Sequence, residues 1–450
     1  MKTILPSILV AFACHSLLAQ PNVILIVCDD AGYADFGFMN PVTGTTTKML
    51  TPELDTLRAQ GTLFTKTYTG TVCSPSRGSI LTGSYGQRVG YEHNINNHLG
   101  ANDGPEGFAH EDVIAFERMK QISGANYKTL AIGKWHVGAQ ADTLSGGSVT
   151  VPGNRPPRQG VDHFFGLLGG SRPYATPMAA DQISREVKLL REISPGATAT
   201  DPANNSNEED SGNWDGDITD AFGKRAREYV TAHANQSYPF FLYVAFTAPH
   251  GPLEQSADYA ALSNPSHPNY TNFTSMSDDR KKYYSMLYTM DRNVGLLMDR
   301  LEDPNNDGNT SDSIVDNTLV IFINDNGGAT SSNTGLNLPL RGQKGAVYDG
   351  GCRVPMLMVG PNIPVNASFD KPVHSMDIVP TMIGAGGNTI PAELMGTNLI
   401  PYITGADSSD PHEYVIVRAV NKFGLRKGNY KLILEADGDQ FLYDTSTDIG

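Results

Sequence analysis

Four apolar runs constrain the fold of this chain more than any other feature of its sequence. They are NVILIVCDD (22–30), KTLAIGKWHVG (128–138), FFLYVAFTAPHG (240–251) and NTLVIFINDNGG (317–328). A run that is apolar throughout, rather than alternating, is typical of a strand covered on both faces. Such strands, separated by helical patterns, form a mostly parallel sheet with helices on each side. We therefore predict an α/β fold built on a large, mostly parallel sheet.

Polar residues follow each of these runs where the strand is predicted to end. They are Asp29 and Asp30, Lys134 and His136, His250, and Asp325 and Asn326. In open α/β sheets, ligands bind beyond the carboxyl ends of the strands. Any one of these residues alone is best explained as a turn or a helix cap, because Asp and Asn favour both. Four strands together favour a shared site at one edge of the sheet.

The acidic members of this group are typical of a metal site. They offer only oxygen ligands: Asp29, Asp30, Asp325 and Asn326. Oxygen ligands suit Ca²⁺ or Mg²⁺ rather than zinc, and Ca²⁺ is the better match because it accepts bidentate carboxylates and irregular geometry. Without a cation, three adjacent carboxylates would repel one another and raise one another's pKa. Three basic residues would suit an anionic substrate: Arg77, Lys134 and Lys344.

The segment TVCSPSRGSILTG at 71–83 places a cysteine in a turn-forming run before a short apolar segment. We predict the first turn of a helix entered through Pro75, where backbone N–H groups favour an anion. A reactive thiolate is one interpretation of Cys73, but soft sulfur suits a hard, oxygen-lined metal site poorly. Cys28 and Cys352 lie in or beside apolar strands, and we expect buried thiols there rather than disulfides or zinc ligands.

The first 20 residues, MKTILPSILVAFACHSLLAQ, have one lysine, an apolar centre and a small-residue end, which is typical of a cleaved signal peptide. Pro6 and His15 leave the apolar run too short to span a bilayer, and no later stretch is apolar enough to do so. The residues before Cys14 lack the leucine expected of a lipoprotein. We therefore expect an exported protein, periplasmic or secreted, without a membrane span.

Charge bears on the expected partners. The formal net charge is −15, and it becomes −16 when Lys2 is removed with the signal peptide. So acidic a chain is a poor general binder of nucleic acid, and we expect no nucleic-acid partner. A polyanionic substrate stays compatible with this charge if basic residues gather in a cleft.

The motif C-S-P-S-R at 73–77, continued by L-T-G at 81–83, resembles that of the formylglycine-dependent (type I) sulfatases of the alkaline phosphatase superfamily. Four further family motifs occur in order: DDAGYADFG, GKWHVG, APHG and NDNGG. RGQKGAVYDGGCRVP resembles the segment with the family's last active-site lysine, with Asp349 where the family usually has glutamate. The resemblance extends from Pro21 to Gly450. It implies a large sheet sandwiched by helices, as in alkaline phosphatase, with a small C-terminal antiparallel sheet.

The resemblance also implies a modified residue and a cofactor. A formylglycine-generating (sulfatase-maturating) enzyme would oxidise Cys73 to formylglycine, also called 3-oxoalanine. One Ca²⁺ ion would be held by the modified residue together with four oxygen-bearing side chains: Asp29, Asp30, Asp325 and Asn326.

The same resemblance assigns roles to the basic residues. Arg77 would support the formylglycine, and Lys134 and Lys344 would bind sulfate oxygens. His136 would hydrogen-bond the hydrated aldehyde, and His250 would be the general acid. One hydroxyl of the hydrate would attack sulfur while His250 protonates the departing alcohol. The second hydroxyl would then collapse to the aldehyde and expel sulfate, which a plain serine or cysteine could not do.

The function implied is hydrolysis of sulfate esters, by a sulfuric ester hydrolase of class EC 3.1.6.-. By analogy with bacterial polysaccharide-degrading sulfatases, the substrate would be a sulfated oligo- or polysaccharide: a carrageenan-like galactan, ulvan or a glycosaminoglycan. Two alternatives stay open. One is a phosphodiesterase or phosphonate hydrolase of the same superfamily, and the other is a sulfoglycan-binding protein without enzyme activity.

Arg341 is the strongest candidate for contacting the rest of the substrate, because it lies three residues before Lys344. Four further residues are weaker candidates: Arg172, His93, His98 and His163. A lone histidine is more often a structural hydrogen-bonding group than a ligand.

The chain is predicted to have three parts: a signal peptide (1–20), a catalytic domain (21–390) and a C-terminal subdomain (391–450). The last part contains alternating strands joined by Gly-Asn and Asp-Gly turns, which is typical of an antiparallel sheet. It stops at TSTDIG, where family members usually run on, so we expect a truncated end. DPNNDGNTSD at 303–312 begins like a calcium loop, but Ile314 stands where such a loop needs glutamate, which disfavours a second calcium site.

Overall fold

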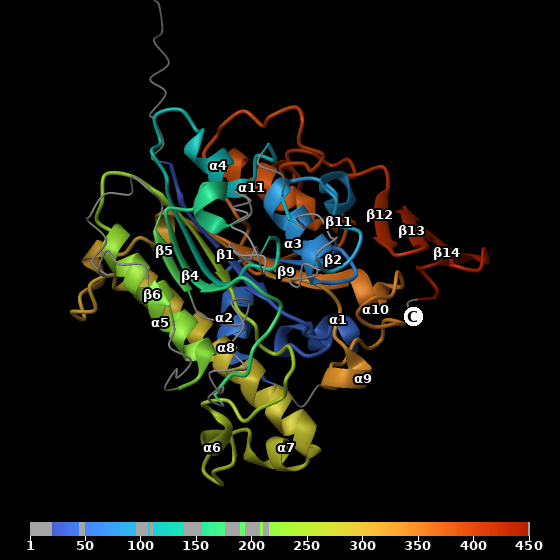
Figure 1. Cartoon of the computed structure of the whole chain (residues 1–450), viewed down its shortest axis with the longest axis horizontal. Coiled ribbons are helices and arrows are strands. Elements are labelled where there is room, and N and C mark those ends of the chain that lie inside the picture. Colours follow the sequence, from blue (N-terminus) through green and yellow to red (C-terminus); the bar gives the residue numbers. More distant parts are fainter. Residues whose placement is uncertain are drawn as a thin grey trace, which may run out of the picture.

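A large mixed sheet forms the centre of the computed structural model, with helices on both of its faces (Figure 1). The structure describes residues 20–44, 50–95, 107–108, 111–138, 155–175, 190–193, 208–209 and 216–448. In spatial order the strands are β10 (Ala367–Phe369), β2 (Thr62–Tyr68), β9 (Arg353–Val359), β8 (Thr318–Asn324), β1 (Asn22–Cys28), β7 (Phe240–Ala245), β3 (Lys128–Lys134), β4 (His163–Leu167), β5 (Leu190–Ile193) and β6 (Glu208–Glu209). A further strand, β11 (Val373–His374), also pairs with β2.

The four predicted strands are neighbours at the centre of this sheet, in the order β8-β1-β7-β3. All three pairings among them are parallel, so their carboxyl ends meet at one edge. β9 runs antiparallel to both β8 and β2, and β2 therefore points the same way as β8. The predicted α/β class with a mostly parallel sheet is thus confirmed.

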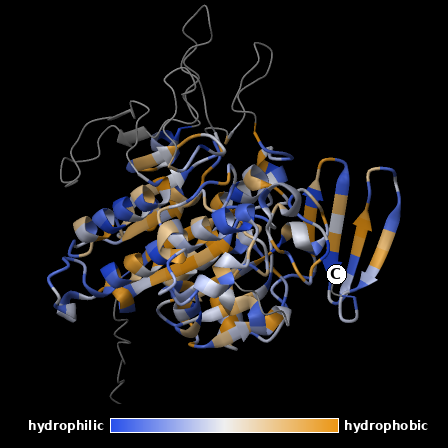
Figure 2. Cartoon of the chain, turned by 90° about the horizontal axis from the view of Figure 1, so that it is seen from below, coloured by the Kyte–Doolittle hydropathy of each residue, from blue (hydrophilic) through white to orange (hydrophobic). Residues whose placement is uncertain are grey.

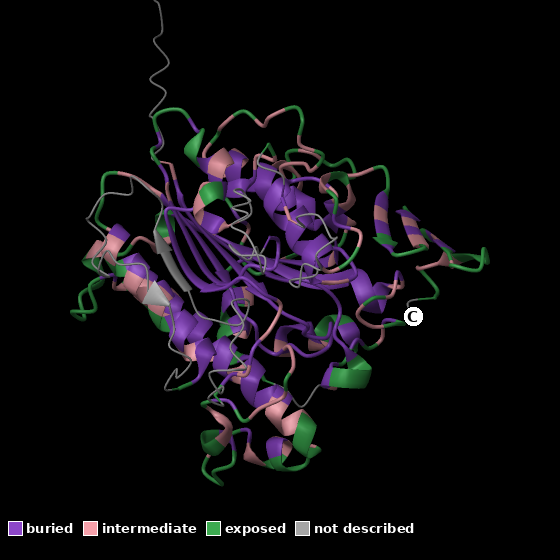
Figure 3. Cartoon of the chain, in the orientation of Figure 1, coloured by how far each residue is buried: buried purple, intermediate pink, exposed green. Residues whose placement is uncertain are grey.

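Burial on both faces explains why these strands lack alternation. In β1, Ile24 and Ile26 join one apolar cluster, whereas Val23, Leu25 and Val27 join another. The first cluster includes residues of α2 (Pro52–Ala59), α5 (Ile218–His233) and α8 (Asp278–Glu302). The second includes residues of α3 (Cys73–Thr82), α4 (Ala115–Lys120) and α11 (Ile378–Ala385). The central strands β8, β1 and β7 lie fully buried between these two layers (Figure 3).

Two long helices on the first face begin at residues that cap them. The Asp217 carboxylate accepts a hydrogen bond from the backbone N–H of Thr219 at the start of α5. The Ser277 hydroxyl accepts one from the N–H of Arg280 at the start of α8. Such caps satisfy N–H groups that have no partner within the helix. The remaining short helices are α1 (Asn40–Thr43), α6 (Tyr259–Leu262), α7 (Tyr270–Thr274), α9 (Thr330–Asn333), α10 (Asp349–Cys352) and α12 (Ile400–Ile403).

A separate four-stranded antiparallel sheet lies near the C-terminus, as predicted (Figure 2). Its strands are β12 (Val415–Ala419), β13 (Lys422–Lys427), β14 (Tyr430–Leu434) and β15 (Gln440–Asp444). Gly428 and Asn429 form the tight turn between β13 and β14, and Gly428 has a positive φ of 55° that suits glycine. Residues of β12 and β14 alternate between buried and more exposed, because one face packs toward the large sheet.

The structure bears on several other expectations. Among the described residues, no helix combines the length and apolar character needed to cross a bilayer. The predicted signal peptide, with Cys14, lies almost wholly outside the described residues. The predicted boundary between residues 390 and 391 stays a prediction. Cys28 and Cys352 are buried free thiols, as expected.

Candidate active site

The carboxyl ends of the central strands bring the predicted site residues to one edge of the sheet. β1 is followed by Asp29 and Asp30, β8 by Asp325, and β3 ends at Lys134. β2 leads through residues 69–72 into α3. α3 begins at Cys73, two residues before the predicted entry at Pro75, so that the cysteine sits in the first turn of a fully buried helix.

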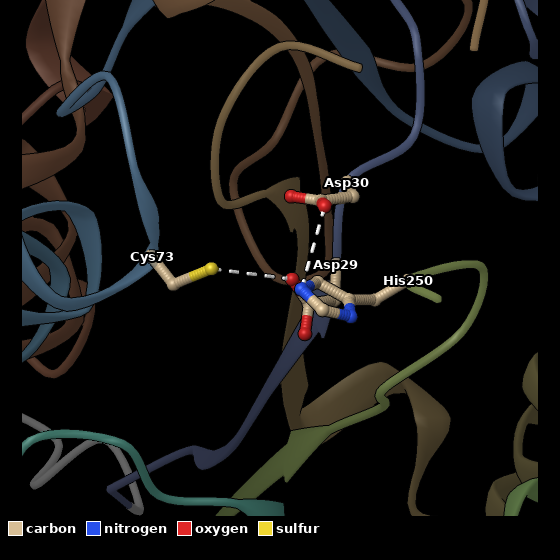
Figure 4. Close-up of side chains that lie close together, drawn as sticks. All are labelled: Asp29, Asp30, Cys73 and His250. Atoms are coloured by element: carbon tan, nitrogen blue, oxygen red, sulfur yellow. Dashed lines mark hydrogen bonds and ion pairs between the residues drawn. The ribbon is translucent and has the colours of Figure 1, made fainter. Parts of the chain in front are cut away.

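The Cys73 side chain lies among charged groups. Its Sγ is 3.3 Å from Lys134 Nζ, 3.3 Å from Lys344 Nζ and 3.6 Å from Asp29 Oδ1. Figure 4 shows this thiol pointing at the Asp29 carboxylate, with Asp30 and His250 close by. Residue 73 therefore stands where two ammonium groups and a carboxylate converge.

Arg77, one turn after Cys73 on α3, pairs with two of the carboxylates. Its Nη2 lies 3.1 Å from Asp325 Oδ2 and 3.5 Å from Asp29 Oδ2, and all three side chains are fully buried. Its Nη1 donates to the backbone oxygen of Lys134 at 2.9 Å and to the Tyr243 hydroxyl at 3.3 Å. A planar guanidinium can bond several acceptors at once, which makes arginine suited to this position.

The two lysines each pair with one carboxylate of the first strand. Lys134 Nζ lies 2.6 Å from Asp29 Oδ2, and Lys344 Nζ lies 2.7 Å from Asp30 Oδ1. Burial disfavours the charged form of Asp29. The neighbouring cations, Lys134 first among them, outweigh burial, so the pKa of Asp29 is lowered. Three cationic side chains therefore face three carboxylates within one site.

The donor set fits a hard metal ion. Ligand atoms of Asp29, Asp30, Cys73 and His250 all lie within 4.8 Å of one another. Asn326 Oδ1 is buried and has no hydrogen-bond partner among the residues that the structure describes, although Nδ2 of the same residue donates to Asp30 Oδ1 at 2.7 Å. An orphaned buried oxygen beside carboxylates is what a cation-binding site provides. The oxygens of Asp29, Asp30 and Asn326 match Ca²⁺ or Mg²⁺, whereas the Cys73 thiol and the His250 imidazole in the same cluster are softer donors.

Crowding of these charges disfavours ionisation of the Asp325 carboxyl group. Burial and then the neighbouring Asp29 raise its pKa to about 7, and Arg77 opposes the rise. A carboxyl group beside two carboxylates resists ionisation. This is expected where the ligands of a cation are already assembled before the cation binds.

The thiol of Cys73 is not activated. Burial raises its pKa to about 12, and the lowering effect of Lys134 and Lys344 does not compensate. The thiolate is the nucleophilic form of cysteine, so the structure disfavours the interpretation of Cys73 as a plain thiolate nucleophile.

Two histidines flank the site from different strands. His136 has a left-handed φ of 53°, and within the described part of the chain its buried Nδ1 has no hydrogen-bond partner. Burial, reinforced by Lys134, lowers its pKa well below the usual value, which keeps the ring neutral. His250 Nδ1 lies 2.6 Å from the Gly251 carbonyl oxygen and so donates to it, while Nε2 lies 3.5 Å from Asp30 Oδ2. Burial lowers the pKa of His250 as well, although Asp30 opposes this.

Asp30 and His136 share an uncommon backbone conformation. Asp30 has φ 65° and His136 has φ 53°, in the left-handed region that residues with a Cβ adopt rarely. Strained residues of this kind cluster at functional sites, where the surrounding structure holds them in place.

Sequence reasoning missed three supporting side chains. The Ser74 hydroxyl donates to the His136 carbonyl at 2.8 Å, and the Tyr174 hydroxyl donates to the His250 carbonyl at 2.9 Å. The third is Tyr243 inside β7, which contacts Arg77. The place of Ser74 next to Cys73 was an available signal. The two tyrosines gave none, because nothing distinguishes them from core aromatics.

Residues predicted at the rim of the site differ in their placement. Arg341 Nη1 donates to the Tyr443 hydroxyl at 3.2 Å, and its guanidinium lies 4.3 Å from the centre of the Tyr348 ring. Its contact with substrate stays a prediction. His163 begins β4 and pairs with Leu130, near the amino end of β3, so it does not contribute to this edge.

The remaining candidates differ in burial. Arg172 is buried just beyond β4, on the carboxyl side of that strand, and His93 is exposed. His98 lies outside the described residues. In the loop at 303–312, the Asp303 carboxylate accepts hydrogen bonds from the N–H groups of Asp307 and Gly308. A second calcium site there stays a prediction.

Comparison with known proteins places the chain in a family. The family model described as sulfatase matches residues 21–388, and the chain belongs to this family. The combination of this family, the fold and the Cys73 motif defines a type I sulfatase with an alkaline phosphatase-like fold. Its activity is that of a sulfuric ester hydrolase.

Relatives and solved structures agree with this assignment. A protein of Formosa agariphila named sulfatase is 28% identical, over 96% of this chain and 83% of its own length. Arylsulfatase A of Homo sapiens is 28% identical, over 94% of this chain and 77% of its own. The crystal structure of Ps i-CgsB in complex with k-i-k-neocarrahexaose has a TM-score of 0.76 and 29% identity, covering 96% of this chain and 87% of that one.

Proposed function

We propose that this sulfatase works through a formylglycine at position 73, formed by oxidation of the Cys73 side chain. One observation carries the proposal: Cys73 Sγ lies 3.3 Å from both Lys134 Nζ and Lys344 Nζ, and 3.6 Å from Asp29 Oδ1. An oxygen nucleophile at this position would lie between two cations that could bind an anion and side chains that suit a hard metal, whereas burial raises the pKa of the thiol and so keeps it protonated. A hydrated formylglycine would supply a carbon that bears two hydroxyl groups.

We further propose Ca²⁺ as the cofactor. Its ligands would be residue 73 and the oxygens of four side chains: Asp29, Asp30, Asp325 and Asn326. A bound Ca²⁺ ion would supply positive charge that favours an ionised hydroxyl and a negatively charged sulfuryl group. The unpartnered Asn326 Oδ1 and the raised pKa of Asp325 support such a site.

The chain's own cations would bind the ester. Lys134 and Lys344 present their ammonium groups beside residue 73, where they would pair with the sulfate oxygens that do not react. Arg77 stays with Asp29 and Asp325, and so it would hold the carboxylates in place beneath the substrate. Charge stabilisation of this kind is worth on the order of 3–4 kcal/mol for each well-placed group.

Proton transfer would use the histidines. His250 donates from Nδ1 to Gly251, which leaves Nε2 facing the site. Burial lowers the pKa of His250, so only the protonated fraction of the enzyme would give an Nε2 proton to the departing alcohol as the ester S–O bond breaks. His136, held neutral by burial, would hydrogen-bond a hydroxyl of residue 73.

We infer that the substrate is a sulfated carbohydrate, such as a carrageenan-like galactan, ulvan or a glycosaminoglycan. Support comes from the structural neighbour at 29% identity, whose crystal structure contains k-i-k-neocarrahexaose. We also infer export through the predicted signal peptide, and maturation by a formylglycine-generating enzyme that acts on Cys73.

The test is sulfate release from defined sulfated oligosaccharides by protein made with and without the maturation enzyme. We expect release only from the co-expressed protein, and only from a subset of the sugars. Matching phosphate diesters and phosphonates serve as the comparison. Faster hydrolysis of those esters than of every sulfate ester would contradict the proposal.

A further inference from the structure

A second cluster of buried charges surrounds Asp349, where the C-terminal sheet meets the large sheet. Asp349 Oδ1 lies 2.5 Å from Lys431 Nζ, and Oδ2 lies 3.5 Å from Arg353 Nη1 and 3.8 Å from Arg426 Nη1. The Tyr68 hydroxyl donates to Oδ2 at 3.2 Å and accepts from Arg426 Nη1 at 2.9 Å. All five side chains are buried. The proposed mechanism uses none of them.

The members of this cluster belong to segments that also carry the proposed nucleophile and a sulfate-binding lysine. Tyr68 ends β2, five residues before Cys73, and Asp349 lies five residues after Lys344. Two backbone hydrogen bonds join these segments: Thr69 N donates to Cys352 O at 2.8 Å, and Gly345 N donates to Thr71 O at 2.7 Å. A shift of the Asp349 carboxylate would therefore displace both segments.

Arg353 extends the cluster to the first metal-binding segment. Its Nη2 donates to the Tyr33 hydroxyl at 3.2 Å, and Tyr33 lies three residues after Asp30. Its Nε donates to the Thr65 carbonyl at 2.9 Å, and the Tyr33 hydroxyl donates to the same oxygen at 2.7 Å. One arginine thus connects the segment after β1 with β2 and with Asp349.

The charge balance of the cluster depends on one carboxylate. Burial opposes ionisation of Asp349, but Lys431 and Arg353 outweigh it and hold the pKa at about 2. Three cations share that carboxylate, two of them from the C-terminal sheet. Loss of its charge would leave them buried without a counter-ion, which drives a local rearrangement.

We propose that Asp349 is a positioning residue, which locks the C-terminal sheet against the segments that carry Cys73 and Lys344 and so fixes the distance between them. The inference rests on the proposed roles of those two residues. By this proposal the C-terminal sheet contributes to catalysis, because its residues Lys431 and Arg426 pair with Asp349.

The experiment compares three variants of the full chain: Asp349→Asn, Asp349→Glu and the control Asp162→Asn. Asp162 is also a buried carboxylate paired with a lysine, since its Oδ1 lies 2.6 Å from Lys120 Nζ. Its Oδ2 accepts from the Thr129 N–H at 3.0 Å, at the end of β3 opposite Lys134. Sulfate release is divided by the fraction of residue 73 found as formylglycine, so that poor maturation is not mistaken for poor catalysis.

We expect Asp349→Asn to lower kcat by roughly tenfold to a hundredfold with a small change in KM, as for misplacement of reacting groups by about 1 Å. Asp349→Glu keeps the charge and should restore most of kcat, while Asp162→Asn should lose stability but keep its kcat. If Asp349→Asn proves too unstable, Lys431→Met removes one partner and leaves two cations on the carboxylate. Equal kcat for wild type, Asp349→Asn and Lys431→Met would overturn the proposal.

Hydrogen exchange on the same proteins separates this inference from the proposed function. Peptides covering residues 69–73 and 341–349 should exchange faster in Asp349→Asn, and not in Asp162→Asn. This readout does not require turnover. Wild-type protein that carries formylglycine and releases no sulfate would refute the proposed mechanism, whereas unchanged exchange in Asp349→Asn would refute the lock.

Discussion

Two buried clusters of charge in the described part of the molecule, the candidate active site and the group around Asp349, differ in how their charges balance. In the candidate active site, three carboxylates crowd together and the pKa of Asp325 rises to about 7. Around Asp349, one carboxylate meets three cations and its pKa falls to about 2. The first cluster holds charges that favour binding of additional ions, as functional sites do. The second binds two parts of the fold together, so its loss should appear first as instability or misplacement.

The largest expected effect is on the nucleophile itself. Cys73→Ala removes the precursor of formylglycine, and sulfate release should fall by roughly 10⁴-fold or more, as when an enzyme loses its nucleophile. The free energy of unfolding should change little, because Lys134 and Lys344 lose their contacts with the thiol but keep their ion pairs with Asp29 and Asp30. Sulfate release by Cys73→Ala near the wild-type rate would contradict the mechanism.

Removal of the metal should have the next largest effect. Asp325→Asn weakens the proposed calcium site, and we expect kcat to fall by roughly 10²–10³-fold. Addition of Ca²⁺ should raise the Tm of metal-free wild type, because a ligand that binds only the folded state stabilises it, and should not raise that of the variant. Calcium that persists in purified Asp325→Asn would instead point to a second site, with the loop at 303–312 as the first place to look.

Substitutions in the Asp349 cluster should change the stability of the fold. Lys431→Met removes a buried partner, and we expect the free energy of unfolding to fall by about 3 kcal/mol in chemical denaturation. Lys427→Met is the matched control on the neighbouring strand, because its ion pair with Glu413 is largely exposed. An exposed pair is worth less than about 1 kcal/mol. A similar loss of unfolding free energy in Lys431→Met and Lys427→Met would contradict the expectation that the buried pair contributes more than the exposed one.

The smallest effect is expected from an ion pair that belongs to neither cluster. His412 Nε2 lies 2.8 Å from Asp377 Oδ2. Burial lowers the pKa of His412, but its bond to Asp377 outweighs this, and the net shift is upward. The pair therefore stabilises the fold fully below the unfolded pKa of about 6.5, and this contribution is lost as pH rises through the folded value.

His412→Gln isolates that contribution. The difference in unfolding free energy between wild type and the variant should shrink between pH 6 and pH 9, because the raised pKa of His412 makes its pair with Asp377 stabilising only while the ring is protonated. Chemical denaturation at a series of pH values measures it. A difference that stays constant with pH would show that His412 does not titrate as part of this pair.

The sequence predicted the sheet and its functional edge because both depend on local patterns. An apolar run such as residues 22–28 must be buried on two sides, and parallel strands deliver their next residues to one edge of the sheet. Asp29, Lys134 and Asp325 could therefore be grouped without any knowledge of contacts. The Cys73 helix was recognisable in the same way, from Pro75 and the turn-forming residues around it.

The Asp349 cluster could not be predicted by these means. Lys431 and Arg426 occur in alternating strands, where charged residues normally face solvent, and only the packing of the C-terminal sheet on Tyr68 and Cys352 buries them. Partners so distant in sequence leave no local signal. The same holds for Tyr243, which resembles any other aromatic residue of a core strand until Arg77 is placed beside it.

The central claim is that residue 73 acts as formylglycine and not as cysteine. The most direct measurement prepares wild-type protein with different extents of maturation, determines the formylglycine fraction of the peptide containing residue 73 by mass spectrometry, and plots kcat against that fraction. We predict a straight line through the origin, with no activity in protein that carries only cysteine. Sulfate release that is independent of the formylglycine fraction, or that persists at zero, would contradict the account.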